Sequence, residues 1–230
     1  MITSHGSAGH GFLIIMSRVI TGIQSQKRNK QRLNISLDGE YAFSLDRLTA
    51  AWLKEGQTLS EAQVRTLQEK DEKEIAWARA LHYLSFRSRS RQEMAQYLQK
   101  KGYESAAADQ VIDRLTDEGF LDDARFAQDW IENRNALRPR GERLLRRELQ
   151  QKGLAEEVIE LAFQKSGKDE NALAFQAGEK IARRYKDLPW DLFLRRLVNS
   201  LQRKGFSYST SHDAATKNWR DLHDGVEDNN

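Results

Sequence analysis

LQKKGY at residues 98–103 is followed by LQQKGL at 149–154 and by LQRKGF at 201–206. The glycines of the three copies are 51 and 52 residues apart. A short motif that returns at a fixed interval of this length is typical of a chain built from repeated structural units. This internal repeat predicts an array of similar units.

Each copy has the composition of a helix end. The leucine suits the buried face of a helix, the lysine lies in the last turn, where the helix dipole favours cations, and the glycine permits a left-handed stop. An apolar residue follows to close the motif. The sequence therefore predicts three equivalent helix stops, at Gly102, Gly153 and Gly205.

Helical patterns surround each stop. An amphipathic segment, a short basic connection and a second helix precede each glycine, and segments 106–118 and 155–165 follow the first two. The third copy is less regular, with 214–222 as its last helix. The predicted unit is three helices over about 50 residues, and units of this size gain a core by stacking on their neighbours.

The N-terminal part has the pattern of strands rather than of helices. Residues 19–45 alternate apolar and polar side chains, and Asp38-Gly39 between two such runs is a strong signal for a two-residue hairpin turn. Three short strands are expected there, with a helical pattern from Asp46 onward. Ser60-x-x-Gln63 and Ser90-x-x-Glu93 both match the capping box that starts a helix.

The expected fold is mainly α. It is an elongated array of three tandem three-helix repeats after a small N-terminal β-hairpin or three-strand element. The expected boundaries are a disordered tail at 1–15, the hairpin and a helical link at 16–71, repeats at 72–120, 121–168 and 169–222, and an acidic disordered tail at 223–230. Met1 and Met16 are the alternative starts.

Composition narrows the class of protein. Of 230 residues, 31% are charged and 39% hydrophobic, the net charge is +3, and no cysteine is present. The lack of cysteine excludes disulfides and thiolate chemistry and fits a reducing compartment, so a cytoplasmic location is expected. No apolar stretch has the roughly 18 residues of a membrane span.

Basic residues gather in the connections before the repeat glycines and on the helices that follow. Guanidinium groups form bidentate pairs with carboxylates and phosphates, so either an acidic protein surface or a DNA backbone would fit. The alternative is an ordinary solvated helix face. The repeated placement favours a partner-binding role for Arg87, Arg89, Arg91, Arg138, Arg140, Arg143, Arg146, Arg147, Arg195, Arg196, Arg203 and Lys204.

The sequence contains no constellation typical of an enzyme. Asp122-Asp123 could pass for a catalytic or metal-binding pair, but its position before Arg125 and Phe126 favours capping of a helix. Gly167-Lys168 lacks the first glycine of a phosphate loop. No enzymatic activity, cofactor or metal is expected.

Residues 118–127, EGFLDDARFA, resemble the signature of the RecX family, and 143–153 and 90–102 are similar to the helices of its second and first repeats. The N-terminal hairpin resembles the extension of longer family members. The structural positions of this pattern are Gly102, Gly119, Leu121, Asp122, Asp123, Phe126, Gly153 and Gly205.

The resemblance implies a non-enzymatic modulator of the RecA recombinase. Such a protein binds the recombinase filament on DNA along its groove and limits its extension, ATP hydrolysis, strand exchange and co-protease activity. A monomer with weak, adjunct DNA contact and no membrane association is expected. The alternatives are a free-standing helical DNA-binding module and a passive helical scaffold.

Overall fold

The computed structural model describes residues 17–223. These residues belong to two compact units, one ending at Arg79 and the other beginning at Ala80. Each unit is described by itself. The predicted tail at 1–15, the alternative starts at Met1 and Met16, and residues 224–230 lie outside the described residues.

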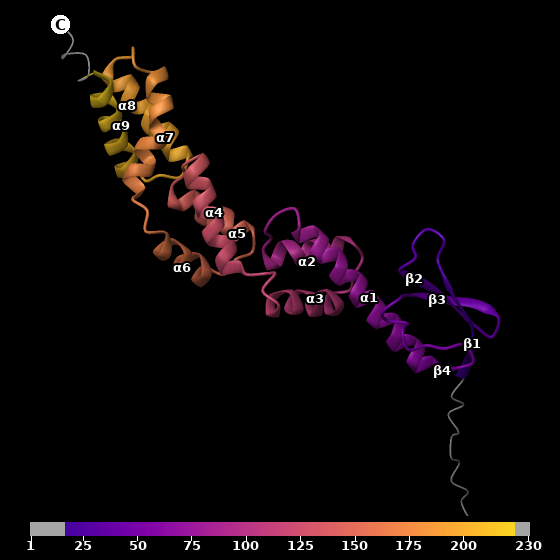
Figure 1. The fold of residues 1–230 in the computed structure, drawn as a ribbon. Coiled ribbons are helices and arrows are strands. Elements are labelled where there is room, and N and C mark those ends of the chain that lie inside the picture. The colour runs from indigo at the N-terminus through magenta and orange to yellow at the C-terminus, as the bar shows by residue number, and fades with distance from the viewer. Residues whose placement is uncertain (1–16, 224–230) are drawn as a thin grey trace, which may run out of the picture. The chain divides into compact units, whose positions relative to one another are not determined.

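The first unit contains a four-stranded antiparallel sheet with the strand order β3-β2-β1-β4 (Figure 1). Its core holds buried side chains from all four strands, including Ile20, Ile35 and Leu45. Asp38 and Gly39 both have positive φ, 53° and 90°, as the predicted two-residue hairpin turn requires. The strands are β1 (Ser17–Ser25), β2 (Arg32–Leu37), β3 (Glu40–Asp46) and β4 (Thr58–Ser60).

The helical link expected from Asp46 onward is wrong over its first part. Residues 47–57 form turns, and β4 pairs with β1, so that Leu59 becomes a fully buried member of the sheet's core. A three-residue strand is too short to show an alternating pattern, which explains why the sequence did not predict it.

The helix of the link, α1 (Glu61–Leu84), begins where its capping box predicts. The Ser60 N–H donates to Gln63 Oε1 at 2.8 Å, and the Gln63 N–H donates to Ser60 Oγ at 3.2 Å. Leu67 of α1 is buried in the core of the sheet. Asp71, also buried, accepts hydrogen bonds from the Arg32 side chain and the Asp46 N–H, which tie the helix to two strands.

From Ala80 onward, the described chain is helical and follows the predicted pattern of triplets (Figure 1). The end of α1 belongs to the first triplet, with α2 and α3. The helices are α2 (Arg91–Lys100), α3 (Ser105–Asp117), α4 (Asp123–Leu137), α5 (Glu142–Gln151), α6 (Glu156–Ser166), α7 (Glu170–Arg184), α8 (Trp190–Arg203) and α9 (Tyr208–His223).

The three repeat glycines end the middle helix of each triplet. Gly102, Gly153 and Gly205 have φ values of 90°, 80° and 98°, which confirms the left-handed stops predicted from the sequence. The apolar residue after each stop is buried. Its backbone N–H donates to the carbonyl of the repeat leucine, as in Tyr103 to Leu98 at 3.2 Å.

Successive triplets contact each other where one middle helix begins and the next one ends. In the first joint, formed by Ser90, Gln92 and Glu93 with Lys152 and Gly153, the Ser90 hydroxyl donates to the Lys152 carbonyl at 2.7 Å. Lys152 Nζ lies 2.6 Å from Glu93 Oε1. A Cβ atom on Gly153 would lie 2.5 Å from the Cβ of Gln92, so glycine gives the space for this contact.

The second joint, formed by Gly141 and Leu144 with Lys204 and Gly205, repeats the geometry with other chemistry. The Gly141 N–H donates to the Lys204 carbonyl at 3.0 Å. A Cβ atom on Gly141 would overlap the backbone of Gly205 and Phe206. The carbonyl that precedes the repeat glycine thus accepts a hydrogen bond in both joints.

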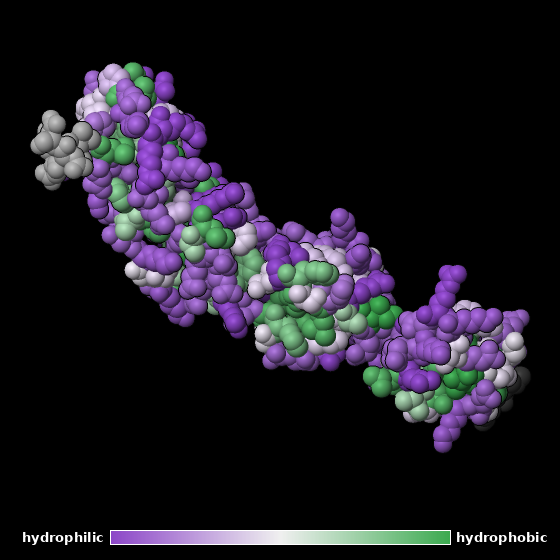
Figure 2. Space-filling model, turned by 45° about the horizontal axis from the view of Figure 1, so that its top comes forward, coloured by the Kyte–Doolittle hydropathy of each residue, from purple (hydrophilic) through white to green (hydrophobic). Residues whose placement is uncertain are grey.

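Each of the last two triplets has its own core. Phe126, Ile131, Leu145, Leu149 and Ile159 form the buried cluster of the second triplet together with neighbouring alanines. In the third, Phe193 is fully buried, and Trp190 and Trp219 pack edge to face with ring centroids 5.3 Å apart. Figure 2 shows a mostly hydrophilic visible face with a hydrophobic area over the first triplet.

Candidate interaction surface

The structure places the predicted basic residues at equivalent points of successive triplets. Arg87 and Arg89 lie in the connection before α2, and Arg138 and Arg140 lie in the connection before α5. Arg91 and Arg143 lie one or two residues into the helices that follow. Their contacts divide the predicted set into arginines that hold the fold together and arginines available to a partner.

Arg87 belongs to the first group. Its guanidinium forms a bidentate pair with Glu93, at 2.9 and 3.0 Å, and Lys152 binds the same carboxylate across the first joint. Burial opposes ionisation of Glu93, but the hydrogen bonds and positive charges of Arg87 and Lys152 outweigh it and lower its pKa to about 2. Because the carboxylate of Glu93 is taken by these cations, only the Ser90 half of the predicted capping box forms, with the Glu93 N–H donating to Ser90 Oγ at 3.2 Å.

Arg91 is also held internally. Its side chain donates to Asp113 at 2.8 Å and to the hydroxyl of Thr116, both on α3. The Arg91 backbone N–H donates to Asp123 at 2.9 Å. Burial raises the pKa of Asp123 in spite of this hydrogen bond. Asp123 therefore links the start of α4 to the start of α2.

Glu148 on α5 pairs with one arginine of α4 and one of the connection before α5. Arg140 and Arg134 both form ion pairs with its carboxylate, the latter at 3.0 Å, and Trp130 Nε1 donates to the same oxygen at 2.9 Å. The Glu148 side chain is only 14% exposed. Arg140 is therefore a structural residue of the second triplet.

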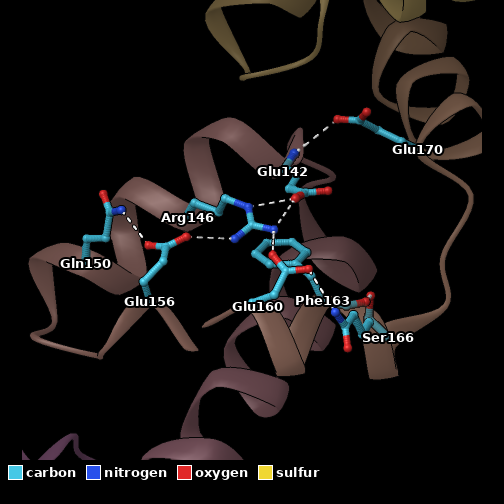
Figure 3. Close-up of polar contacts among 9 residues, drawn as sticks. Glu142, Arg146, Gln150, Glu156, Glu160, Phe163, Ser166 and Glu170 are labelled. Carbon is cyan, nitrogen blue, oxygen red and sulfur yellow. Dashed lines mark hydrogen bonds and ion pairs between the residues drawn. The ribbon is translucent and has the colours of Figure 1, made fainter. Parts of the chain in front are cut away.

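Arg146 lies among three carboxylates (Figure 3). It pairs with Glu142 one turn earlier, at 2.6 Å, and with Glu156 and Glu160 of α6, at 3.0 and 2.6 Å. Its guanidinium also stacks on the ring of Phe163, 4.8 Å from the centroid. These ion pairs hold α5 against α6. They also neutralise Glu142, the acidic residue on this side of α5.

The other predicted cations lack an ion pair within residues 17–223. Arg89 lies over the ring of Tyr83 at 3.9 Å, and Arg196 lies 5.5 Å from the centroid of Tyr185. Both aromatic contacts leave the positive charge uncompensated. The remaining members of this group are Arg138, Arg143, Arg147, Arg195, Arg203 and Lys204.

Three of these arginines line one open cleft of about 500 Å³ between α5 and α8. We call it the arginine cleft. Its guanidinium groups come from both helices, and no carboxylate lines it. Such a surface attracts anions. The lining residues are Arg143, Leu144, Arg147, Asn199, Gln202, Arg203 and Gly205.

A second groove of about 500 Å³ is more apolar and lies against α4. Phe126, Trp130 and Leu137 give it an apolar wall, and Asp129 and Arg138 also line it. Leu137 is 81% exposed.

The residues of the predicted family signature have structural contacts. Asp122 accepts a hydrogen bond from the Arg125 N–H at 3.0 Å, which confirms it as the cap of α4. Leu121 and Phe126 are buried on either side of that cap, and Gly119 has a φ of 76°. These residues build the start of the second triplet.

The sequence analysis did not predict the amide residues that line the arginine cleft. It also did not predict which acidic residues neutralise the other arginines. Asn199 and Gln202 carried no signal, because polar residues on a helix are common. Glu93 gave a signal only as a helix cap. The charge count of α5 did carry information, since its three arginines exceed its two acidic residues.

Comparison with known proteins assigns all four parts of the described chain to one family. The RecX N-terminal domain model matches residues 18–60, and the models of the first, second and third RecX three-helix domains match 76–115, 122–162 and 168–214. The chain belongs to the RecX family.

RecX relatives match over most of their length. The chain is 34% identical over 211 residues to the regulatory protein RecX of Bacillus licheniformis, covering 90% of this chain and 80% of the relative. It is 36% identical over 192 residues to that of Bacillus subtilis, covering 82% and 73%.

Solved RecX structures share the fold. One crystal structure of a regulatory protein RecX is 28% identical, with a TM-score of 0.69 over 84% of this chain and 96% of that chain. RecX from Lactobacillus salivarius, 23% identical with a TM-score of 0.59, covers 65% of this chain and 97% of its own and supports the fold alone. No helix in the described part of this RecX chain is long and apolar enough to cross a membrane.

Proposed function

We propose that this chain binds a RecA-type recombinase filament on DNA and limits its extension, ATP hydrolysis, strand exchange and co-protease activity. The observation that carries this proposal is the match of four consecutive RecX domain models to the chain. The protein would act in the cytoplasm, in DNA repair, homologous recombination and the SOS response, as a monomer without catalysis of its own.

The geometry supports binding along a polymer. Joints of the same kind connect successive triplets, so equivalent surfaces recur along the second unit. Arginines that no described acid neutralises lie on the second and third triplets. A ligand of this kind changes a filament only by binding one of its states more tightly than another.

The decisive experiment is a titration of recombinase ATP hydrolysis on single-stranded DNA. We expect turnover to fall at amounts of the chain well below one per recombinase protomer. Unchanged turnover at equimolar protein would contradict the proposal. Hydrolysis by an unrelated helicase on the same DNA is the control, and we expect it to be unaffected.

The helicase control also distinguishes a filament regulator from a free-standing DNA-binding module. Such a module would slow both ATPases by occupying the DNA, and added single-stranded DNA would relieve the inhibition. A regulator bound to the filament keeps its effect when DNA is in excess. A passive scaffold would change neither reaction.

A further inference from the structure

We propose that the arginine cleft between α5 and α8 binds phosphate groups of a nucleic-acid strand. This inference rests on the proposed function, because a protein seated on a nucleoprotein filament lies within reach of DNA. It assigns three of the arginines that no described acid neutralises to the DNA of the filament.

The two walls of the cleft present rows of donors. Arg143 and Arg147 are one turn apart on α5, and Asn199 and Arg203 are one turn apart on α8. Residues four apart lie on the same face of a helix, so each wall presents its pair in the same direction. Gln202 adds an amide at the end of α8.

The charge of the cleft is uncompensated for a structural reason. The acidic residues of α5 point elsewhere, Glu142 to Arg146 and Glu148 to Arg140. Within the described part of the chain, the Arg143 side chain donates only to the Gln202 carbonyl, at 3.3 Å, and the Arg203 side chain donates to Ser200 Oγ at 3.2 Å. Arg147 has no hydrogen bond or ion pair to any described residue.

The second joint holds the two walls at a fixed separation. The Gly141 N–H donates to the Lys204 carbonyl, and the backbones there touch so closely that neither Gly141 nor Gly205 has room for a Cβ atom. Both walls are helices packed in buried cores, so the backbone positions that carry the donors are held at one separation. Anion binding then has to order only the side chains and not the two walls.

Three convergent guanidinium groups fit a phosphate better than a carboxylate. A single carboxylate carries one charge and takes two cations in this chain, as Glu93 and Glu148 do, whereas a phosphodiester chain offers successive charged oxygens to several arginine forks. Amide side chains such as Asn199 and Gln202 are also common donors to phosphate and sugar oxygens. The cleft is open to solvent and mainly polar, unlike the enclosed apolar pockets that hold small ligands.

The test measures binding of the full chain to a fluorescein-labelled oligothymidine by anisotropy, without recombinase and over a range of salt. We expect the triple variant R143Q/R147Q/R203Q to bind at least tenfold more weakly. The slope of log K against log salt should fall by roughly 2, since each single-strand phosphate contact contributes about 0.7. The matched control R183Q/R184Q/K186Q removes three exposed positive charges at the end of α7 and should bind within about twofold of the original chain.

A second variant keeps the charge and removes the fork. R143K/R147K/R203K should bind more weakly than the original chain but more tightly than the glutamine triple, because lysine attracts phosphate as a point charge. Circular dichroism and thermal melting should be the same for all variants. Equal losses in the cleft and control triples, or no binding by the original chain, would overturn the site.

Tighter binding of inorganic phosphate than of the oligonucleotide, at ionic strength matched with chloride, would identify a site for free phosphate and contradict the proposal. The ATPase titration separates this inference from the proposed function. Loss of DNA binding in the cleft variant supports the DNA site. Inhibition of the recombinase by the original chain supports the proposed function. If the chain inhibits the recombinase but the cleft variant binds DNA as tightly as the original chain, the proposed function stands and the DNA site in the cleft is wrong.

Discussion

The two joints of the helical unit share one acceptor, the carbonyl that precedes the repeat glycine, and differ in the groups around it. In the first, a serine hydroxyl and the Glu93–Lys152 ion pair bridge the triplets. In the second, Gly141 brings two backbones together with no side chain between them. The comparison shows that the repeat conserves a geometry rather than a set of side chains.

The difference has a consequence for the surface. The first joint neutralises its own cations, because Glu93 takes both Arg87 and Lys152. The second joint has no acid, so Arg143 and Arg203 beside it remain available to an anion. The stability of the first joint therefore depends on pH. The stability of the second joint depends on the absence of a side chain at Gly141.

The largest expected effect is that of Gly141→Ala. Gly141 has an ordinary φ of −69°, so the substitution creates no backbone strain, but the new methyl group overlaps the backbone at Gly205. Backbone cannot move aside as a side chain can, and we expect the second joint to open at a cost of about 3 kcal/mol. Hydrogen–deuterium exchange should show lost protection at the start of α5 and the end of α8. Unchanged protection there would show that the joint is not tightly packed.

The second effect is that of Glu93→Gln at the first joint. Because the folded pKa of about 2 lies below the ordinary 4.5, the charge of Glu93 stabilises the fold fully above about pH 5. That stability is lost as the pH falls through about 2. We expect the variant to lose roughly 2 kcal/mol at pH 7 and to show a flatter stability profile between pH 5 and 2, measured by urea unfolding.

The control for Glu93 is Glu118→Gln. Glu118 pairs with Arg114 one turn away on the surface and is 44% exposed, so its loss should cost less than about 0.5 kcal/mol. Equal dependence of unfolding free energy on pH in the two variants would show that Glu93 makes no special contribution to the first joint.

The smallest effect is the excess cost of Gly153→Ala over Gly102→Ala. Both glycines have a positive φ, and alanine there costs about 1 kcal/mol in either case. Only the methyl group at 153 meets a neighbour, Gln92, whose side chain can turn away, whereas the space at 102 is open. We expect an excess of about 1 kcal/mol or less in urea unfolding. An excess as large as the cost of Gly141→Ala would mean that the first joint is equally rigid.

Much of the fold follows from local patterns in the sequence. The hairpin turn at Asp38-Gly39, the cap at Asp122 and the three glycine stops each depend on a few neighbouring residues, and all are confirmed. The short strand β4 was not predicted, because only its pairing with β1 makes it a strand. The domain boundaries taken from these patterns remain predictions.

The candidate site was predicted less completely. The basic residues were found by counting charges, but their division into paired and available groups needed the structure. Arg140 and Arg143 looked equivalent in the sequence, yet one is bound to Glu148 and the other lines the arginine cleft. Whether these residues contact a recombinase or DNA remains a prediction.

Helix starts and stops follow from local sequence, since caps, turns and left-handed glycines act within a few residues. The neutralisation of each charge depends instead on contacts between distant parts of the chain. Lys152 meets Glu93 across 59 residues of chain, and the walls of the arginine cleft come from α5 and α8. Ion pairing depends on distances of a few ångströms, and those distances are set by how closely the triplets pack.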